Sequence, residues 1–577
     1  MKLFKLREYF LSMNIYSRFF FTVLLSLLIS IECSAQSSNI PLNPDYYHLI
    51  DRFDIKSGGT IHTSYKAYKR SEVARLLDSI DINDGHYSSV DRFNRDYISI
   101  DNWEWTREGN EESKKPIWNV FYKSKPDLYH VDSKDFDLHV NPVLHLGVGY
   151  DTESDLTTYI NSRGVEIRGM INKQVGFYSY LVENQMINPG YVRNFTSEFG
   201  VVPHEGFWKN FKDNGVDFFT ARGYISFEAA KFINFQFGHD RFKIGDGFRS
   251  MLLSDFGNNY LFLKINTQVW KIRYTNLFTK VNADAFGAGG VSPGDDFPDK
   301  YVTSHHLSID VTPNLNIGLF EAVIFGAEDD FGNSSFNLAY LNPIIFYRAV
   351  EQNEGSDDNA MVGMDFKWNI KKRYQLYGQF IFDEFKLDEL TSGTGWWANK
   401  FSGQFGVKYL DALGIQNLDL QGEVNISRPY TYSHNNLFTN YSHYRQPLAH
   451  PFGANFKEFV GVARYQPMDR LTFVGKIILA TYGTDSIDSN FGKNILLDNT
   501  TRTNGTPDPD FGNEIGQGIG NDLLFLDLTI SYQLKHNLFL DLQQTFRQLD
   551  NELSGEATTS YTAFSFRWNI PKRIHDF

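Results

Sequence analysis

The residues near the end of the chain alternate between two kinds of side chain, and this pattern constrains the fold more than any other feature. One side of the segment from Thr558 to Ile570 is apolar and largely aromatic, and the other is polar; the apolar side carries Phe564, Phe566 and Trp568. A period of two is typical of a β-strand, because successive side chains point to opposite faces. The chain then ends on an aromatic residue, Phe577. Bacterial outer-membrane barrels commonly end this way, and we expect this strand to close a barrel against the first one.

The same alternation recurs through the C-terminal four-fifths of the chain. With a template of ~10 alternating residues per strand, about 18 strands can be counted. Their expected starts lie near residues 136, 158, 174, 216, 232, 259, 269, 302, 315, 359, 373, 401, 416, 455, 470, 522, 537 and 558. In a transmembrane barrel the apolar face meets lipid and the polar face lines a wet interior. The sequence therefore predicts an all-β transmembrane protein, an antiparallel outer-membrane β-barrel of about 18 strands.

The connections between these segments alternate between short and long. Short turns lie at 172–174, 313–314, 371–372, 467–469 and 535–537, and long polar segments lie at 188–215, 240–258, 281–301, 326–358, 388–400, 428–454 and 484–521. Short turns at one end and long loops at the other are typical of outer-membrane barrels. One residue does not fit: Glu321 lies on the apolar side of its strand, and a bulge or a misplaced boundary would explain it.

Composition favours one large β-structure over several soluble domains. Aromatic residues make up 16% of the chain, yet its mean hydropathy is −0.36. After the N-terminus, no stretch has the ~20 consecutive apolar residues of a transmembrane helix. The formal net charge is −14, so nucleic acid is not an expected partner, and a polyanion would have to bind to local positive patches.

Residues 1–35 have the features of a secretory signal peptide. Arg18 precedes an apolar run from Phe19 to Ile31, and small residues before Gln36 offer a cleavage site after Ala35. Glu32 argues against lipidation of Cys33, the only cysteine. Cleavage removes four basic and two acidic side chains, which leaves a net charge of −16 and no thiol chemistry.

From about Pro41 to Glu104 the chain has helical rather than strand periodicity, and we assign residues 36–130 to a periplasmic helical section. Ser71 can cap a helix with Val73, Leu76, Leu77 and Ile80 on one stripe, and two further short helices are indicated near Tyr46–Phe53 and Val90–Tyr97. A section this small has no secure core of its own, so we expect it to dock at the periplasmic mouth of the barrel formed by residues 131–577.

Aromatic and basic residues on two long loops suit the binding of sugars, which offer an apolar ring face and a rim of hydroxyls. The candidate polysaccharide-binding residues are Arg428, Tyr430, Tyr432, His434, Tyr441, Tyr444, Arg445, Trp396 and Trp397. For the two tryptophans, an aromatic girdle at the membrane interface is the alternative.

The segment from Gly238 to Asp255 is rich in charge and glycine. It can fold into the lumen as a polar constriction, or it can be a loop whose charges pair with the wall. The residues in question are His239, Asp240, Arg241, Lys243, Asp246 and Arg249.

Enzyme and metal motifs are not found in the sequence, so we expect a non-catalytic protein without a cofactor. His305-His306 and His204-Glu205 are interpreted as solvated or lumen-lining residues. Acidic pairs such as Asp329-Asp330 and Asp357-Asp358 do not follow the calcium-loop pattern, although weak calcium binding stays open.

Several segments resemble the Wzi-type capsule assembly proteins, in particular the Bacteroidota branch that includes the gliding-associated RemB-like proteins. They are YYHLIDRFDIKSGGTIHTSYKAYKRSEVARLLDSI, NSRGVEIRG, the Gly238–Asp255 segment, YLNPIIFYRAVEQNEGSDDNAMVG, YGQFIFDEF, RPYTYSH and YRQPLAHPFGANFKEF. The resemblance covers essentially the whole mature chain. It implies an 18-stranded outer-membrane barrel with a periplasmic helical section, and a non-catalytic role in attaching capsular polysaccharide to the cell surface.

Two other functions stay open at this point. RemB-like relatives imply gliding or adhesion, and a barrel of this size can also enclose the aqueous channel of a passive porin. The expected partners are outer-membrane lipid, surface polysaccharide and the barrel-assembly machinery. The sequence leaves the oligomeric state open.

Overall fold

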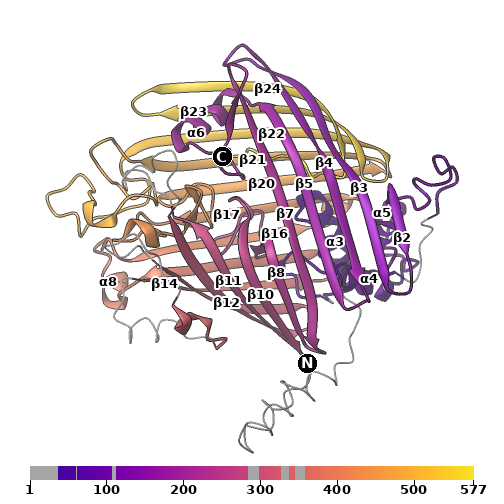
Figure 1. Ribbon diagram of the computed structural model, residues 1–577. Helices are drawn as coiled ribbons and strands as arrows, with labels where there is room; N and C mark the ends of the chain where they lie inside the picture. Colours follow the sequence, from indigo (N-terminus) through magenta and orange to yellow (C-terminus); the bar gives the residue numbers. More distant parts are fainter. Residues whose placement is uncertain (1–36, 60, 107–111, 284–297, 327–336, 345–357) are drawn as a thin grey trace, which may run out of the picture.

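A computed structural model of the protein describes residues 37–59, 61–106, 112–283, 298–326, 337–344 and 358–577 (Figure 1). The predicted signal peptide lies outside these residues, as do Asp329, Asp330 and Asp357. Among the described residues, no helix is long and apolar enough to cross a membrane.

Eighteen long strands in the described part of the chain form one closed antiparallel barrel. They are β3 (Phe136–Asp151), β4 (Leu156–Ile171), β5 (Val175–Ile187), β7 (Gly215–Ala230), β8 (Ile233–Asp240), β10 (Tyr260–Val269), β11 (Ile272–Asn282), β12 (Asp299–Thr312), β13 (Leu315–Phe325), β14 (Asn359–Ile370), β15 (Tyr374–Glu384), β16 (Lys400–Tyr409), β17 (Leu418–Ser427), β20 (Phe456–Met468), β21 (Leu471–Thr484), β22 (Ile519–Lys535), β23 (Leu538–Asn551) and β24 (Gly555–Trp568). The prediction of an 18-stranded barrel is confirmed, and each strand begins within three residues of its expected start.

The last strand closes the barrel against the first. β24 pairs with β3 from Tyr561↔Asp151 to Trp568↔Leu144. The last residues of the chain differ from the expectation, however. The closing strand β24 stops at Trp568, and residues 569–577 leave the sheet. Phe577 is therefore not part of the closing strand.

The two ends of the barrel differ in the length of their connections. At one end, here called the turn end, successive strands are joined by segments of eight residues or fewer, such as 270–271 and 410–417. At the other end, here called the loop end, seven connections are long. The two short connections at the loop end, 152–155 and 552–554, lie beside the closing seam.

The outer face of the strands is apolar and the inner face is polar, as the alternation predicts. Phe564, Val424 and Leu528 are about half exposed on the outer face. Their sequence neighbours Ser565, Asn425 and Asp527 point inward. Burial of such an apolar band in lipid is what positions a transmembrane barrel.

Glu321 is not explained by a bulge or by a misplaced boundary. It keeps regular register in β13 opposite His305 of β12, and the two side chains form an ion pair at 2.8 Å on the outer face. The segment around η1 (Leu338–Leu341) lies over this part of the wall, where Tyr340 packs against the outward side chains Val323 and Phe325. Both partners of the pair are at most 5% exposed, so this polar pair is covered by protein.

The N-terminal section contains three helices, α3 (Pro44–Ser57), α4 (Arg70–Ser79) and α5 (Ser89–Asp101). Val73, Leu76 and Leu77 of α4 face Ile50 and Phe53 of α3 in a shared apolar core. Ser71 lies inside α4 and does not cap it, because the N-cap is Lys69. Ser88, in contrast, forms a capping box with Asp91 at the start of α5.

Short elements make up the rest of the described structure. They are β1 (Tyr65–Lys66), β2 (Tyr129–Asp132), β6 (Lys209–Phe211), β9 (Lys243–Ile244), β18 (Ser442–His443), β19 (Gln446–Pro447), α6 (Gly190–Phe199), α8 (Leu387–Ser392), η2 (Ala412–Gly414), η3 (Leu437–Thr439) and η4 (Asn499–Thr501). The predicted boundary between the helical section and the barrel, at residue 131, falls within β2, which pairs with the start of β3.

Candidate functional site: a loop cap over a filled lumen

The helical section reaches into the turn end of the barrel instead of only docking at its mouth. Acidic and basic side chains of α3 form ion pairs with inward-facing residues of the barrel wall. The ion pairs are Asp51–Lys408 at 2.7 Å, Asp54–Lys367 at 2.9 Å and Arg52–Asp419 at 2.5 Å. Buried charges are tolerated only when they are paired in this way.

An extended segment after α3 continues deeper into the lumen and meets residues 241–258, here called the lumen loop. β1 pairs with β9 of the lumen loop, and the Gly245 amide donates to the Ser64 carbonyl at 2.6 Å. Burial alone would raise the pKa of Asp246, but the ammonium groups of Lys66, Lys367 and Lys408 lower it to about 2. Asp246 is therefore ionised and helps to join the two segments.

The C-terminal residues 569–577, here called the tail, also turn into the lumen. Arg249 of the lumen loop lies 2.8 Å from Asp576 of the tail and 2.9 Å from Glu458 of the wall. Asp576 also pairs with Lys476 of the wall at 2.6 Å. The tail continues towards the loop end, where the Tyr191 hydroxyl of α6 donates to the His575 carbonyl at 2.8 Å.

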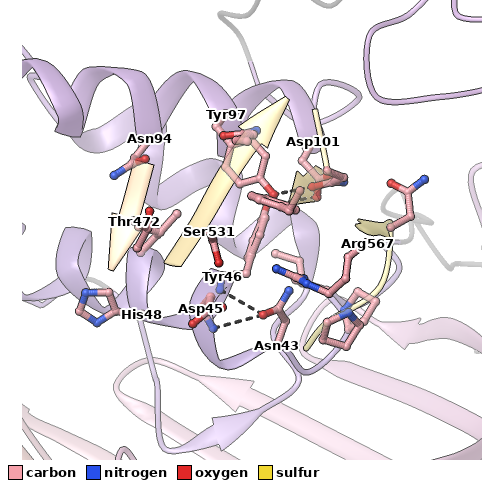
Figure 2. A pocket seen from close by; sticks show the side chains of 18 of the residues that line it. Asn43, Asp45, Tyr46, His48, Asn94, Tyr97, Asp101, Thr472, Ser531 and Arg567 are labelled. Atoms are coloured by element: carbon pink, nitrogen blue, oxygen red, sulfur yellow. Dashed lines mark hydrogen bonds between the residues drawn. The ribbon is translucent and has the colours of Figure 1, made fainter. Parts of the chain in front are cut away.

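A cavity of about 170 Å³ separates the helical section from part of the wall (Figure 2). Asn43 caps α3 here by accepting from the amides of Asp45 and Tyr46. The Tyr46 hydroxyl donates to Asp101 at 3.1 Å. The cavity is lined by both polar and apolar side chains, and Ile570 and Pro571 of the tail form part of its wall.

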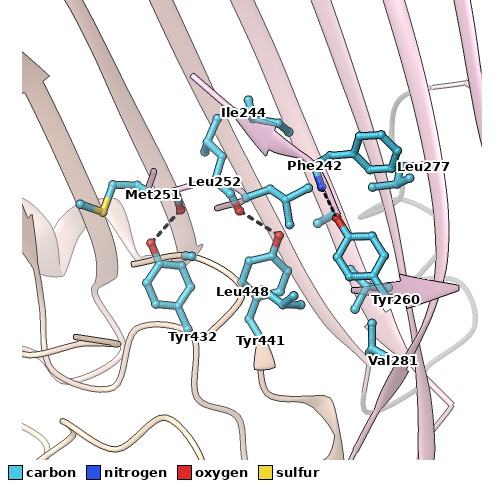
Figure 3. Close-up of a cluster of buried hydrophobic side chains, with 14 of the residues drawn as sticks. Phe242, Ile244, Met251, Leu252, Tyr260, Leu277, Val281, Tyr432, Tyr441 and Leu448 are labelled. Carbon is cyan, nitrogen blue, oxygen red and sulfur yellow. Dashed lines mark hydrogen bonds between the residues drawn. The ribbon is translucent and has the colours of Figure 1, made fainter. Parts of the chain in front are cut away.

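The long loop from 428 to 454, here called the cap loop, is fastened to the lumen loop by buried tyrosines (Figure 3). The Tyr432 hydroxyl donates to the Met251 carbonyl and the Tyr441 hydroxyl to the Leu252 carbonyl, both at 2.8 Å. These two side chains are at most 1% exposed. They therefore anchor the cap loop and have no ring face open to a sugar.

Tyr430 is buried in the same manner against a different loop. Its hydroxyl donates to the Thr503 carbonyl at 2.7 Å, and its amide donates to the Gly492 carbonyl at 2.9 Å. Both partners belong to the long connection 485–518. A tyrosine buries a large apolar ring and needs a partner for its hydroxyl, so an aromatic loop can fold on itself as readily as it can bind a ligand.

The other predicted loop residues are partly accessible. Arg428, His434, Tyr444, Arg445, Trp396 and Trp397 have intermediate exposure. Tyr444 and Arg445 pack on Phe207, with ring centroids 5.2 Å apart for the tyrosine, and Arg445 donates to the Phe199 carbonyl at 3.2 Å. They join the cap loop to the segment that carries α6.

Three loops meet around the two tryptophans. The Trp397 amide donates to the Asp510 carbonyl at 2.9 Å, and Arg428 donates to the Trp396 carbonyl at 3.3 Å. The guanidinium of Arg502 lies 4.1 Å from the centre of the Trp397 ring and pairs with Asp510. We call Trp396, Trp397, Arg428, Arg502 and Asp510 the aromatic rim. Sequence reasoning missed Arg502 and Asp510, because they lie about one hundred residues from the tryptophans.

The residues predicted for a lumen constriction divide into two groups. His239 is exposed on the outward side of β8, the same side as Phe237, so its placement in the lumen was wrong. Asp240 lies 4.0 Å from Arg222 of the wall. The remaining members lie in the lumen loop, where their partners are wall residues, backbone carbonyls and the tail; they are Arg241, Lys243, Asp246 and Arg249.

These features define a class: a closed 18-stranded antiparallel barrel of the outer-membrane type, with an apolar outer band, long loops at one end and a protein-filled lumen. A scan of protein-family models and a search of curated protein sequences find no match to the chain.

Among solved structures, the barrel is similar to that of Wzi, an outer-membrane protein involved in group 1 capsule assembly in Escherichia coli and described as a carbohydrate-binding β-barrel. The TM-score is 0.55 at 13% identity, over 93% of this chain and 99% of Wzi. OprD of Pseudomonas aeruginosa has a TM-score of 0.40 at 11% identity, over 74% of this chain and 94% of OprD. The likeness to Wzi concerns the fold.

Proposed function

We propose that the protein resides in the outer membrane, where it binds or anchors surface polysaccharide, of the capsular kind, and assists capsule assembly without catalysis. The observation that carries the proposal is the combination of two features. The lumen is filled with protein, and the cap loop, which is hydrogen-bonded to the lumen loop, lies beside the aromatic and guanidinium groups of the aromatic rim. Such a barrel is suited to holding a ligand at the cell surface rather than passing one through. The carbohydrate binding described for Wzi, which shares the fold, supports the same choice.

The aromatic rim has the chemistry that this role needs. Trp396 and Trp397 keep part of their rings accessible, and the guanidinium groups of Arg428 and Arg502 lie beside them as local positive charges that attract an anionic polymer despite the acidic charge of the protein. Single contacts of this type contribute about 1 kcal/mol each. Stable attachment therefore requires many repeats of one polymer on many barrels.

The test is replacement of the two rim tryptophans together, Trp396→Ala and Trp397→Ala, in an encapsulated host. We expect polysaccharide to move from the cell-bound to the shed fraction at equal barrel abundance. The matched control is Trp270→Ala, because Trp270 is a highly exposed tryptophan at the opposite, turn end. An unchanged ratio of bound to shed polymer in the double variant would rule out the rim as the holding site.

An alternative role within the same proposal is gliding or adhesion, which the resemblance to the RemB-like proteins of the Bacteroidota branch implies. There the polymer-binding cap would serve gliding or adhesion instead of capsule retention. Deletion of the gene separates these roles: loss of spreading on a surface with normal capsule staining indicates gliding, whereas a thinner capsule with normal spreading indicates capsule assembly.

A further inference from the structure

Three potential metal ligands meet at the turn end, beside the seam at which the barrel closes. His130 lies on β2, and Asp137 and His139 lie on the paired start of β3, with His130 directly opposite His139. One ligand atom from each lies within 4.8 Å of the other two. Nε2 of His139 is 2.8 Å from Oδ1 of Asp137, and Nε2 of His130 is 3.8 Å from Oδ2 of the same carboxylate. In a tetrahedral zinc site, ligand atoms are about 3.3 Å apart.

The second nitrogen of His139 is held by a buried carboxylate. Nδ1 of His139 lies 2.8 Å from Oδ2 of Asp127, an atom that also accepts from the Trp103 indole at 3.0 Å. Asn141 donates to the other oxygen of Asp127 at 3.0 Å. Because an ionised carboxylate only accepts, Nδ1 carries a proton; when Nε2 is unprotonated, as a metal ligand must be, its lone pair faces Asp137. A carboxylate behind a ligating histidine is the usual outer partner in metal sites.

The inward-facing atoms of the cluster lack partners of their own. Nε2 of His130, Nε2 of His139 and Oδ1 of Asp137 are buried, and none makes a hydrogen bond of acceptable geometry within the described residues. His139 is only 1% exposed. A lone pair and a carboxylate oxygen 2.8 Å apart repel each other unless a proton or a cation lies between them, and buried polar atoms without partners are costly.

The local charge also favours a cation. Asp127 and Asp137 bring two negative charges, while the nearby Arg168 is already paired with Glu104 and lies 3.9 Å from Asp127. A dication balances the two carboxylates. Two imidazoles and one carboxylate suit first-row transition metals such as zinc, and poorly suit magnesium or calcium.

We infer that His130, Asp137 and His139 bind one divalent transition-metal ion of the zinc type, with Asp127 orienting His139 and a fourth position left for water. The ion would lie where three parts of the chain meet: β2, the start of β3, and the helical section through Trp103. β24 follows the edge of β3 only as far as Leu144, and β2 occupies that edge from Val140 to Asp137. Trp103 of the helical section packs on both imidazoles, with ring centroids 4.6 and 5.6 Å away. The metal would thus fasten β2 to β3 at the seam and support the ring contacts of Trp103 there.

The experiment uses the full mature protein in detergent, purified without a polyhistidine tag and stripped with a chelator. Titration with zinc, followed by calorimetry, should give one saturable site per chain, and cobalt should give the intense visible absorption of a four-coordinate ion. His130→Phe keeps a ring against Trp103 but removes a ligand, so we expect at least a 100-fold loss of affinity and loss of the cobalt bands. Asp127→Asn should weaken binding about 10- to 100-fold.

His86→Ala is the matched control, because His86 is a well-exposed histidine outside the cluster. It should leave zinc binding unchanged. The inference is overturned if the wild-type protein shows no saturable zinc binding and no four-coordinate cobalt spectrum; a protonated His139 shared by two carboxylates would then account for the contacts. It is equally overturned if a correctly folded His130→Phe variant binds zinc as the wild type does. The wild-type cobalt spectrum decides the matter even if that variant fails to fold.

Discussion

At the scale of single residues, the loop end of the barrel shows that an aromatic residue in a loop can be buried as an anchor or left accessible for contact. Tyr432 and Tyr441 bond to backbone carbonyls of the lumen loop, whereas Trp396 and Trp397 keep part of their rings accessible. The sequence alone identifies both groups as aromatic and polar, but it carries no local signal for which partner a hydroxyl finds. Contacts across some 180 residues decide that.

Removing the two anchoring hydroxyls should loosen the cap loop without disturbing the barrel. We expect Tyr432→Phe combined with Tyr441→Phe to cost about 1 kcal/mol per lost hydrogen bond. The measurement is the rate at which protease cuts within 428–454 in the purified barrel, which should rise several-fold. Tyr444→Phe is the control, since among the described residues its hydroxyl makes no hydrogen bond that fastens the cap loop. Equal cutting rates in all three proteins would contradict the anchoring role.

Arg249 should matter far more for stability than a surface arginine does. It is buried between Glu458 and Asp576, so Arg249→Met removes one cationic partner from each of two buried carboxylates, and breaking a buried ion pair typically costs about 3–5 kcal/mol. We expect a clear fall in the temperature at which the folded, fast-migrating band on gels is lost. Arg163→Met removes an exposed pair with Glu183 and should change stability by less than about 1 kcal/mol. Similar effects of both variants would refute the argument.

At the scale of elements, the strands could be predicted from the sequence, but the contacts between the segments that fill the lumen could not. Every strand start could be placed within three residues, because alternation and turn length are local signals repeated along the chain. The joining of Ser64 to Gly245 and of Arg249 to Asp576 depends on which segments share the interior after closure. The His130, Asp137 and His139 cluster escaped notice for a related reason, because its spacing becomes meaningful only when β2 pairs with β3.

The docking of α5 on α3 should weaken in acid. Burial alone would raise the pKa of Asp91, but Arg52 and Lys56 lower it to about 2, below the ordinary value of 3.8. A carboxyl whose pKa is depressed by folding stabilises the fold above its unfolded pKa and loses that contribution as the pH falls through the folded value. We therefore expect protease cleavage within 37–102 to increase between about pH 4 and pH 2. Asp91→Asn should be more easily cleaved at neutral pH and should show a flatter dependence; an unchanged profile would contradict this.

At the scale of the whole molecule, the interior is occupied from both directions. The helical section enters from the turn end, and the lumen loop and the tail fill the space below the cap. An 18-stranded barrel without such a filling has room for an aqueous channel. On the function proposed here, this filling would distinguish the protein from a porin of the same strand number.

The purified protein should therefore be electrically silent in planar bilayers. We expect no large, stable conductance steps, because the wall charges are paired with segments that fill the pore. An empty barrel of similar strand number, measured in the same membranes, provides the positive control. Long-lived open steps from the wild-type protein would favour the porin alternative.

The fastening of the cap loop to the lumen loop also determines how the molecule responds to a mechanical pull. A force applied to the cap passes through Tyr432 and Tyr441 into the lumen loop, and from Arg249 into Glu458 of β20. The load therefore reaches the wall through the lumen loop as well as through β17 and β20, the two strands that the cap loop connects. Under tension the cap loop and the wall should therefore resist as one unit, and extraction of the whole barrel from the lipid should precede its unfolding.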